Sequence, residues 1–218
     1  MARQQLSDEV ASYLRQAIMA GEFAPGASVR AESVGELLDV SATPVREALH
    51  ALRVEGFLDL IPRRGFTVAP LVADDIRDIF EAHALIAGEL TARATRRAEP
   101  QQLVELQRIH DELTAAAARG DEASVEHLNH VFHRALYLLS GSERLRWALG
   151  NLVKYVPRAF YAQIDGWPEI TTADHSEILE AIKAGEAEKA RLAMAQHIRN
   201  SGEKLAEYFD RRQHRDEE

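Results

Sequence analysis

The sequence predicts a mainly α protein in two parts: a small N-terminal part, in which helices precede a β-hairpin, and a C-terminal antiparallel bundle of six helices. Three observations carry this prediction. Apolar residues recur at three-to-four spacing in most segments, as in amphipathic helices. Alanine, leucine and glutamate are frequent after residue 70, where β-branched residues are few. The stretch 57–68 differs, because its two short apolar runs flank a Pro-Arg-Arg-Gly turn, as in a hairpin.

Three helices are expected before this hairpin. The third has the clearest start, because Ser41 and Thr43 supply short hydroxyl groups where a helix begins. Pro44 suits a first helical turn, where its missing N–H is not needed. Gly21 ends the first helix and Gly56 ends the third. The three helices are expected at residues 7–20, 31–38 and 42–55.

The order of helix, helix and hairpin is that of a winged helix-turn-helix, a DNA-binding module. In such modules the N-terminal residues of the second helix of the pair face base edges in the major groove. Arg46 takes that position here, while Arg63 and Arg64 stand at the tip of the hairpin, the wing. The rival interpretation is an ordinary helix that starts with proline, followed by an unrelated hairpin. The expected DNA-binding residues are Arg30, Ser41, Thr43, Arg46, Arg63, Arg64 and Gly65.

The remaining two thirds of the chain predict the helical bundle. Each segment carries apolar residues at three-to-four spacing, and the breaks between segments fall at glycine or proline. Asp74 can cap the first helix of the bundle, so we expect two domains, 1–70 and 71–218. The charged tail from Arg211 onwards is expected to fray. The six helices are expected at approximately 74–98, 100–118, 121–140, 142–164, 171–184 and 186–212.

Composition narrows the class of protein. The 218 residues include no cysteine, which excludes disulfides and thiolate metal sites. No apolar run approaches the ~20 residues of a membrane span, and residues 1–10 lack the apolar segment of a signal peptide, so we expect a cytoplasmic protein with no membrane partner. The net charge of −9 argues against broad, nonspecific nucleic-acid binding. The few basic groups near the hairpin favour a homodimer, which doubles the DNA contacts.

Three of the nine histidines lie on the apolar faces of three different predicted helices. His133, His175 and His197 would all point into the bundle, where neutral imidazoles from facing helices can bind a divalent metal. Asn129 lies one helical turn before His133 and could add an oxygen ligand. Such a set suits Zn, Ni, Mn or Fe. The alternative is that each histidine is a separate core residue with its own hydrogen bond.

Residues 7–68 resemble the GntR family of bacterial transcription regulators. The resemblance spans the whole N-terminal third and includes the Thr-Pro-Val-Arg-Glu-Ala-Leu core at residues 43–49. It implies sequence-specific DNA binding through the winged helix-turn-helix. Relatives commonly carry arginine after the serine, and Ala42 takes that position here, so the operator can differ from the family's usual one.

Residues 74–205 resemble FCD, the ligand-binding domain of the FadR branch of that family, in its shorter VanR-like version with six helices. The resemblance implies a divalent metal beside a pocket for a small organic acid. Asn129 replaces the family's usual aspartate, which removes one negative charge from the site. The motif residues that match are Asn129-x-x-x-His133, Asp174-His175 and His197.

The effector pocket is harder to predict. Many relatives carry Arg-x-x-Leu-Glu on the first bundle helix, whereas residues 83–87 read His-Ala-Leu-Ile-Ala and lack both charges. His83 lies on the inward stripe, where it faces either the effector or the core. Arg158 and Tyr161 could reach an anionic ligand, although Arg158 lies opposite its helix's apolar stripe, which favours a surface position. His110 matches no motif and is expected in the core.

These features predict a transcription regulator and not an enzyme. Two recognition helices of a homodimer would bind a near-palindromic double-stranded DNA operator. A small carboxylate effector bound beside the metal would change operator affinity, and a repressor released by its effector is the favoured direction. Two alternatives stay open: a metal-dependent hydrolase, for which no general base is obvious, and a DNA-binding protein whose bundle only dimerises.

Overall fold

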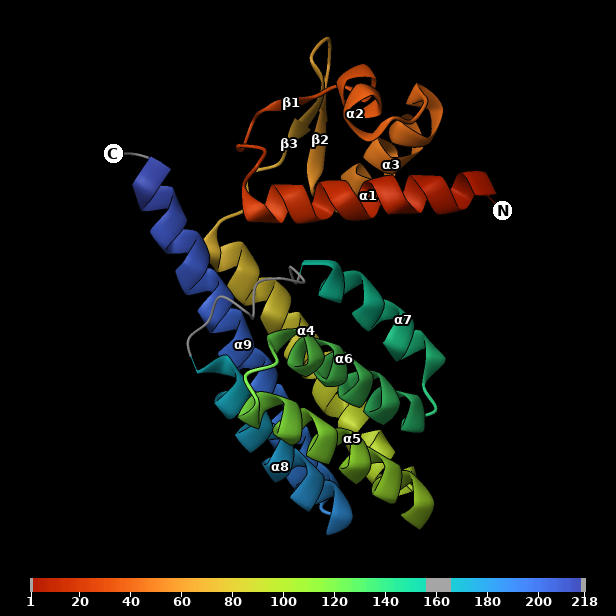
Figure 1. The fold of residues 1–218 in the computed structure, drawn as a ribbon, viewed down its shortest axis with the longest axis vertical. Helices are drawn as coiled ribbons and strands as arrows, with labels where there is room; N and C mark the ends of the chain where they lie inside the picture. The colour runs from red at the N-terminus through yellow and green to blue at the C-terminus, as the bar shows by residue number, and fades with distance from the viewer. Residues whose placement is uncertain (1, 156–165, 217–218) are drawn as a thin grey trace. The chain divides into compact units, whose positions relative to one another are not determined.

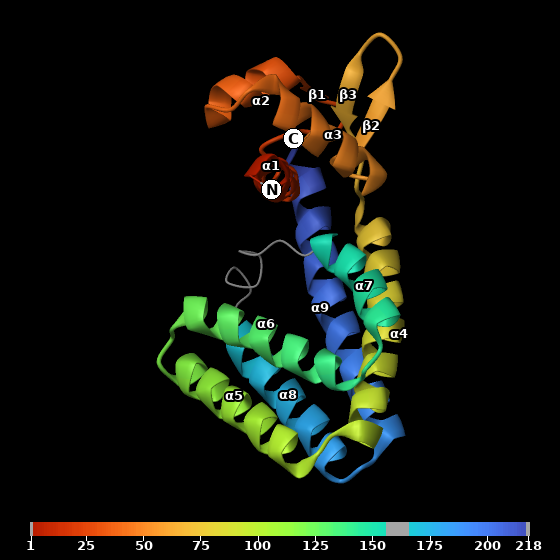
Figure 2. The same ribbon diagram turned by 90° about the vertical axis from the view of Figure 1, so that its right-hand side faces the viewer.

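The computed structural model describes residues 2–155 and 166–216. Within that part the protein is mainly α-helical, as predicted, and it divides into two compact units, Met1–Val72 and Ala73–Glu218. Each unit buries its own set of apolar side chains. Figures 1 and 2 show the helices and strands of both units.

The N-terminal unit contains three helices and a three-stranded antiparallel sheet. Helix α1 packs against α3, and each contributes a buried leucine, Leu14 and Leu49 respectively. The strand order is β1-β3-β2, and β2 and β3 form the hairpin, with Ile61 paired with Gly65 across its turn. The elements are α1 (Ala2–Ala20), β1 (Ser28–Val29), α2 (Ala31–Leu38), α3 (Ala42–Val54), β2 (Leu58–Ile61) and β3 (Gly65–Val68).

The predicted helices and hairpin of this unit are present, with small differences. Helix α1 begins at Ala2, five residues before the expected start at residue 7. Ser41 is the N-cap residue of α3 and has an extended backbone, but its side chain makes no capping hydrogen bond. Strand β1 was not predicted, because a strand that pairs over two residues leaves no periodic pattern in the sequence.

In its described part, the C-terminal unit contains six α-helices. The two longest, α4 and α9, lie side by side (Figures 1 and 2). They run antiparallel, since Gly202 faces Phe80 while Gly88 faces Arg191. The elements are α4 (Ala73–Arg97), α5 (Pro100–Ala118), α6 (Glu122–Leu139), α7 (Glu143–Leu152), the 3₁₀ helix η1 (Val153–Tyr155), α8 (Trp167–Lys183) and α9 (Ala187–Asp216).

Close packing of α4 and α9 depends on a glycine. A Cβ added at Gly202 would overlap the side chain of Phe80, so only glycine allows the two helices to approach this closely there. Helix α5 packs against α6 and α8, and α8 also packs against α9. No helix in the described residues is both long and apolar enough to cross a membrane.

Two helix predictions in the bundle were wrong at their ends. The helix expected at 142–164 is α7, which ends at Leu152 and continues as η1 to Tyr155; the rest of that range lies outside the described residues. Helix α8 begins at Trp167, before the expected residue 171. The Gly-Trp-Pro sequence suggested a break, but Gly166 takes a left-handed φ of 73° as N-cap and proline fits the first turn.

The C-terminal tail also differs from its prediction. Helix α9 continues to Asp216, beyond the expected end at residue 212, so the segment expected to fray from Arg211 is helical up to that point.

Candidate functional site

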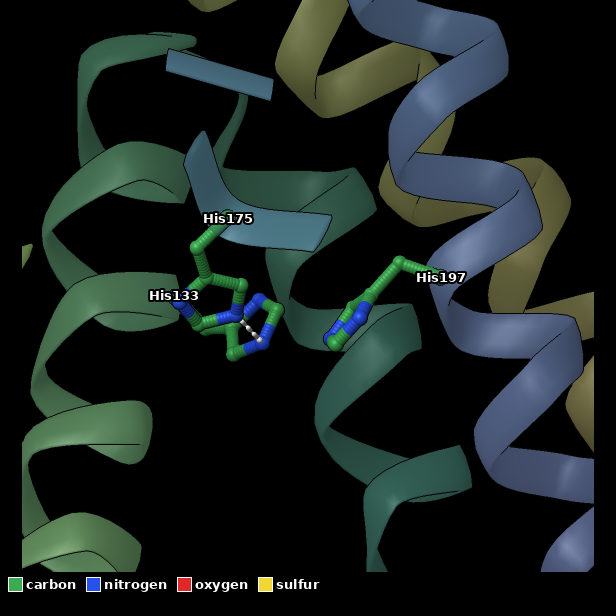
Figure 3. Close-up of side chains that lie close together, drawn as sticks. All are labelled: His133, His175 and His197. Atoms are coloured by element: carbon green, nitrogen blue, oxygen red, sulfur yellow. Dashed lines mark hydrogen bonds between the residues drawn. The ribbon is translucent and has the colours of Figure 1, made fainter. Parts of the chain in front are cut away.

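Three histidine side chains converge inside the C-terminal unit. His133 comes from α6, His175 from α8 and His197 from α9, and Figure 3 shows their rings directed at one another. One ring nitrogen from each lies within 4.8 Å of the others. Nε2 of His175 is 3.3 Å from Nε2 of His133. His175 and His197 are buried and His133 is half-buried, so the structure brings together the three imidazoles that the sequence placed on separate inward faces.

In His133 and His197, the ring nitrogen that points away from the cluster makes a hydrogen bond. This bond determines which nitrogen of each ring keeps a lone pair. The Tyr137 hydroxyl donates to Sδ of Met194 at 3.4 Å, so its oxygen accepts the Nδ1–H of His133 at 3.1 Å. Nδ1–H of His197 donates to Oδ2 of Asp174 at 2.9 Å. Both rings therefore carry their proton on Nδ1 and leave a lone pair on Nε2, which is the arrangement that outer partners impose on metal-binding histidines.

The third ring is held by stacking. The His175 ring lies 4.2 Å from the Phe132 ring, centroid to centroid, with an angle of 18° between the planes. Its Nε2 makes the contact with His133, and its Nδ1 is buried without a hydrogen-bond partner among the described residues. Leaving a buried ring nitrogen without a hydrogen-bond partner costs free energy. Either packing on Phe132 or a bound ligand must therefore hold the His175 ring in this position.

Burial keeps two of these imidazoles neutral. It lowers the pKa of His133 and of His175 well below the usual value, and the nearby His197, which disfavours further positive charge in the cluster, lowers both pKa values further. Neutral imidazole is the form that binds metals. Neutral His133 and His175, together with His197 held by Asp174, therefore fit a divalent cation.

Asn129 and His83 carry further buried polar atoms in this unit. Oδ1 of Asn129, one turn before His133 on α6, is buried and has no hydrogen-bond partner among the described residues. The same holds for Nδ1 of His83 on α4. Burial lowers the pKa of His83 to about 3, and the nearby His197, which disfavours further positive charge, lowers it further.

The structure also contains site residues that the sequence did not single out. Tyr137 lies one turn after His133, and Thr171 lies one turn before His175 with its hydroxyl buried and unpartnered in the described part. In both cases the spacing of four residues from a predicted ligand was the available signal.

His110 is buried as expected, but it also lies beside the cluster, 6.2 Å from the His175 ring, and contacts Ser176 through Nε2. Arg158 and Tyr161, predicted effector contacts, lie outside the described residues.

The residues predicted to bind DNA lie on the surface of the N-terminal unit. Arg46 is on the first turns of α3, and its Nη2 donates to Oε1 of Glu32 on α2 at 2.8 Å. Both side chains are about two-thirds exposed, at 64% and 65%, so this ion pair is weak and can be exchanged for another anion. The other predicted residues are also exposed: Arg30, Ser41, Thr43, Arg63, Arg64 and Gly65.

Comparison with known proteins agrees with both units. Residues 6–68 match the family described as bacterial regulatory proteins, gntR family, and residues 78–200 match the FCD domain. A transcriptional regulator from an unstable DNA locus of Streptomyces ambofaciens is 30% identical over 85% of this chain and 79% of its own. The transcriptional repressor RspR of Escherichia coli is 26% identical over 93% and 90%. The solved structure of E. coli McbR/YncC superposes with a TM-score of 0.71 at 26% identity, covering 94% of this chain and 98% of the other.

These relatives are regulators of transcription and not enzymes, and regulators of this kind bind DNA operators. FCD domains are known to bind metal ions, and the three clustered histidines lie within the FCD match. The chain therefore belongs to the GntR family of bacterial transcription regulators and carries the family's winged helix-turn-helix followed by an FCD domain.

Proposed function

We propose that this protein is a homodimeric repressor whose affinity for a near-palindromic operator is controlled by a small carboxylate bound beside a divalent metal. One observation carries the proposal: three imidazoles from three helices converge, and the outer nitrogens of two of them are held by Asp174 and Tyr137. Separate core histidines would each need a hydrogen bond, but they would not need to converge.

His133, His175 and His197 would hold the metal, and Asn129 would either bind it through Oδ1 or hold a water on it. Zn, Ni, Mn and Fe all suit such ligands. When bound, the metal would supply a positive charge and open coordination positions for carboxylate oxygens. The hydrogen bonds to Asp174 and Tyr137 would keep the two Nε2 lone pairs aimed inward.

The protein would recognise the rest of the effector through polar atoms that now lack partners. Nδ1 of His83 and Oγ1 of Thr171 are buried and unpartnered among the described residues, and Thr171 lies one helical turn before His175. An effector that hydrogen-bonds to them would remove the cost of leaving them unpaired. Arg158 and Tyr161 remain predicted contacts for its carboxylate.

On the DNA side, Arg46 would contact a base or phosphate, and Arg63 and Arg64 would contact the backbone from the wing. Arg30, Ser41, Thr43 and Gly65 would add contacts at the start of α2, at the start of α3 and at the wing. Repression is favoured because RspR, which is similar over most of its length, is a repressor. The effector would lower operator affinity by no more than its differential affinity for the two states of the dimer.

Elemental analysis of the purified protein tests the metal part of this proposal. We expect one divalent metal per chain, and loss of that metal in His197→Ala. Asn129→Asp should tighten metal binding, because it adds a negative charge to a neutral ligand set. Absence of metal after incubation with Zn, Ni, Mn and Fe salts would contradict the proposal. Size-exclusion chromatography with light scattering tests the dimer.

A further inference from the structure

The C-terminal end of α4 and the turn between α6 and α7 form a second recess in the bundle. Its volume is about 210 Å³, and it begins ten residues beyond His83 on α4, which corresponds to ~15 Å of helix. Three arginines, two serines and one glycine line it. The lining residues are Arg93, Arg96, Arg97, Ser140, Gly141 and Ser142.

The recess carries positive charge that the protein does not neutralise. The three arginines are spaced by three and four residues and therefore share one face of α4. Arg93 is already engaged, since its Nε donates to Glu89 at 2.6 Å and its Nη1 lies 3.5 Å from the Ser142 hydroxyl. Within residues 2–155 and 166–216, neither Arg96 nor Arg97 has an acidic group within ion-pair distance.

The nearest acids along the chain are otherwise occupied or exposed. Glu89 is shared between Arg93 and Arg191. The Glu99 carboxylate accepts a backbone N–H at the start of α5, as part of a capping box. Glu143, on the first turn of α7, is exposed to solvent. Among the described residues, therefore, no acid of this unit is paired with Arg96 or Arg97.

The turn between α6 and α7 forms a fixed wall opposite these arginines. The Ser140 hydroxyl donates to the carbonyl of Tyr137 at 2.7 Å and accepts the N–H of Ser142 at 3.2 Å. Gly141 has a φ of 65°, and a Cβ there would lie 2.8 Å from Cζ of Arg97. The Arg97 guanidinium therefore lies close to bare backbone, and a side chain at position 141 would have to displace it.

We propose that this recess binds a phosphate group, either as free phosphate or as the monoester of a small metabolite. Guanidinium groups match the oxygens of phosphate with paired N–H donors, and two unpaired arginines match a double negative charge. The Ser142 hydroxyl adds a donor. A recess of about 210 Å³ is smaller than the ~300–1,000 Å³ of pockets for drug-sized ligands, so the ligand is compact. The site is separate from the histidine cluster.

Calorimetric titration of the full-length protein tests the proposal. The probes are inorganic phosphate and glycerol phosphate, at constant ionic strength, with the protein either stripped of metal by a chelator or loaded with zinc. We expect the same affinity in both forms and a fall of about tenfold or more in the Arg96→Gln/Arg97→Gln double variant. Arg119→Gln, which changes an exposed arginine at the end of α5, is the control and should bind like the wild type. The tighter probe identifies the source of the phosphate.

Melting temperatures without phosphate should agree between the double variant and the wild type, because both arginines are exposed. Three results would overturn the proposal: no binding of either probe, equal binding by the double variant, or binding that requires zinc. The zinc-dependent result would place phosphate at the histidine cluster and would leave the proposed metal site intact.

Discussion

The two units of this protein present their sites in opposite ways. The predicted DNA contacts of the N-terminal unit are exposed and come from short stretches, chiefly 41–46 and 63–65. The candidate metal ligands of the bundle come from three helices, with His133 and His175 42 positions apart, and two of the three are buried. A surface site can change without affecting the fold, whereas a buried site is coupled to packing and protonation. The predictions below test this contrast.

Removal of one imidazole should have the largest effect. We expect His175→Ala to weaken zinc binding by more than ~100-fold, since loss of an outer partner alone costs ~10–100-fold. Competition with a chromophoric chelator measures this. His127→Ala, an exposed histidine on α6, is the control and should bind zinc normally. Equal affinity in the two variants would mean that the cluster is structural.

Removal of an outer partner should have the next largest effect. Asp174→Ala deletes the acceptor of the His197 Nδ1–H, so the ring loses its orientation, and zinc affinity should fall by ~10–100-fold. Glu177→Ala removes an exposed acid from the same helix and tests whether charge alone matters. If both variants weaken zinc binding equally, Asp174 does not orient His197.

In the N-terminal unit, Arg46→Ala should weaken operator binding by about 1–3 kcal/mol. Arg63→Ala and Arg64→Ala should each weaken binding less and reduce its salt slope by about 1. Fluorescence anisotropy with operator DNA measures both quantities. Arg53→Ala, at the other end of α3, should bind normally. None of these changes should alter zinc affinity, and any that does would break the proposed separation between the two sites.

His83 should make the bundle sensitive to acid. Burial lowers the folded-state pKa of His83 to about 3, while an unfolded histidine titrates near ~6.5. As the pH falls, His83 therefore gains a proton in the unfolded chain before it does so in the folded protein. This contribution to stability is complete above about pH 6.5 and is lost progressively as the pH falls towards 3. Between pH 7 and pH 5, the unfolding free energy of the metal-free wild type should fall by about 2 kcal/mol more than that of metal-free His83→Gln. Urea unfolding measures the difference, and identical pH profiles would contradict a buried neutral His83.

The smallest effect should come from Glu32. Its exposed ion pair with Arg46 competes with DNA, so Glu32→Gln should raise operator affinity, by a few fold at most. Glu36→Gln removes the same charge from an exposed position on α2 and serves as the control. A gain of equal size in both variants would reflect net charge and not release of Arg46.

Local signals explain why the N-terminal unit could be predicted almost completely. Pro44, the turn at residues 62–65 and the apolar spacing lie within one stretch, and each acts over a few residues. Strand β1 is the exception, because it exists only through its pairing with β3. In the bundle, spacing alone placed the three histidines on inward faces.

The remaining features of the bundle depend on how helices approach one another. The hydrogen bond from His197 to Asp174 joins α9 to α8, and the contact between Tyr137 and Met194 joins α6 to α9. Neither pairing follows from either helix alone. The recess at Arg96 and Arg97 likewise requires the end of α4 to meet the turn at Gly141, 44 positions later by residue number.

The central claim is that a metal held by the three histidines controls operator binding through a small carboxylate. The most direct measurement is operator affinity by anisotropy, with a panel of small mono-, di- and tricarboxylates, for metal-free, zinc-loaded and zinc-treated His175→Ala protein. We predict that at least one carboxylate weakens operator binding in the zinc-loaded wild type and in neither of the other two. An equal response in metal-free protein or in His175→Ala would contradict the claim, as would zinc-loaded protein that responds to none of the panel.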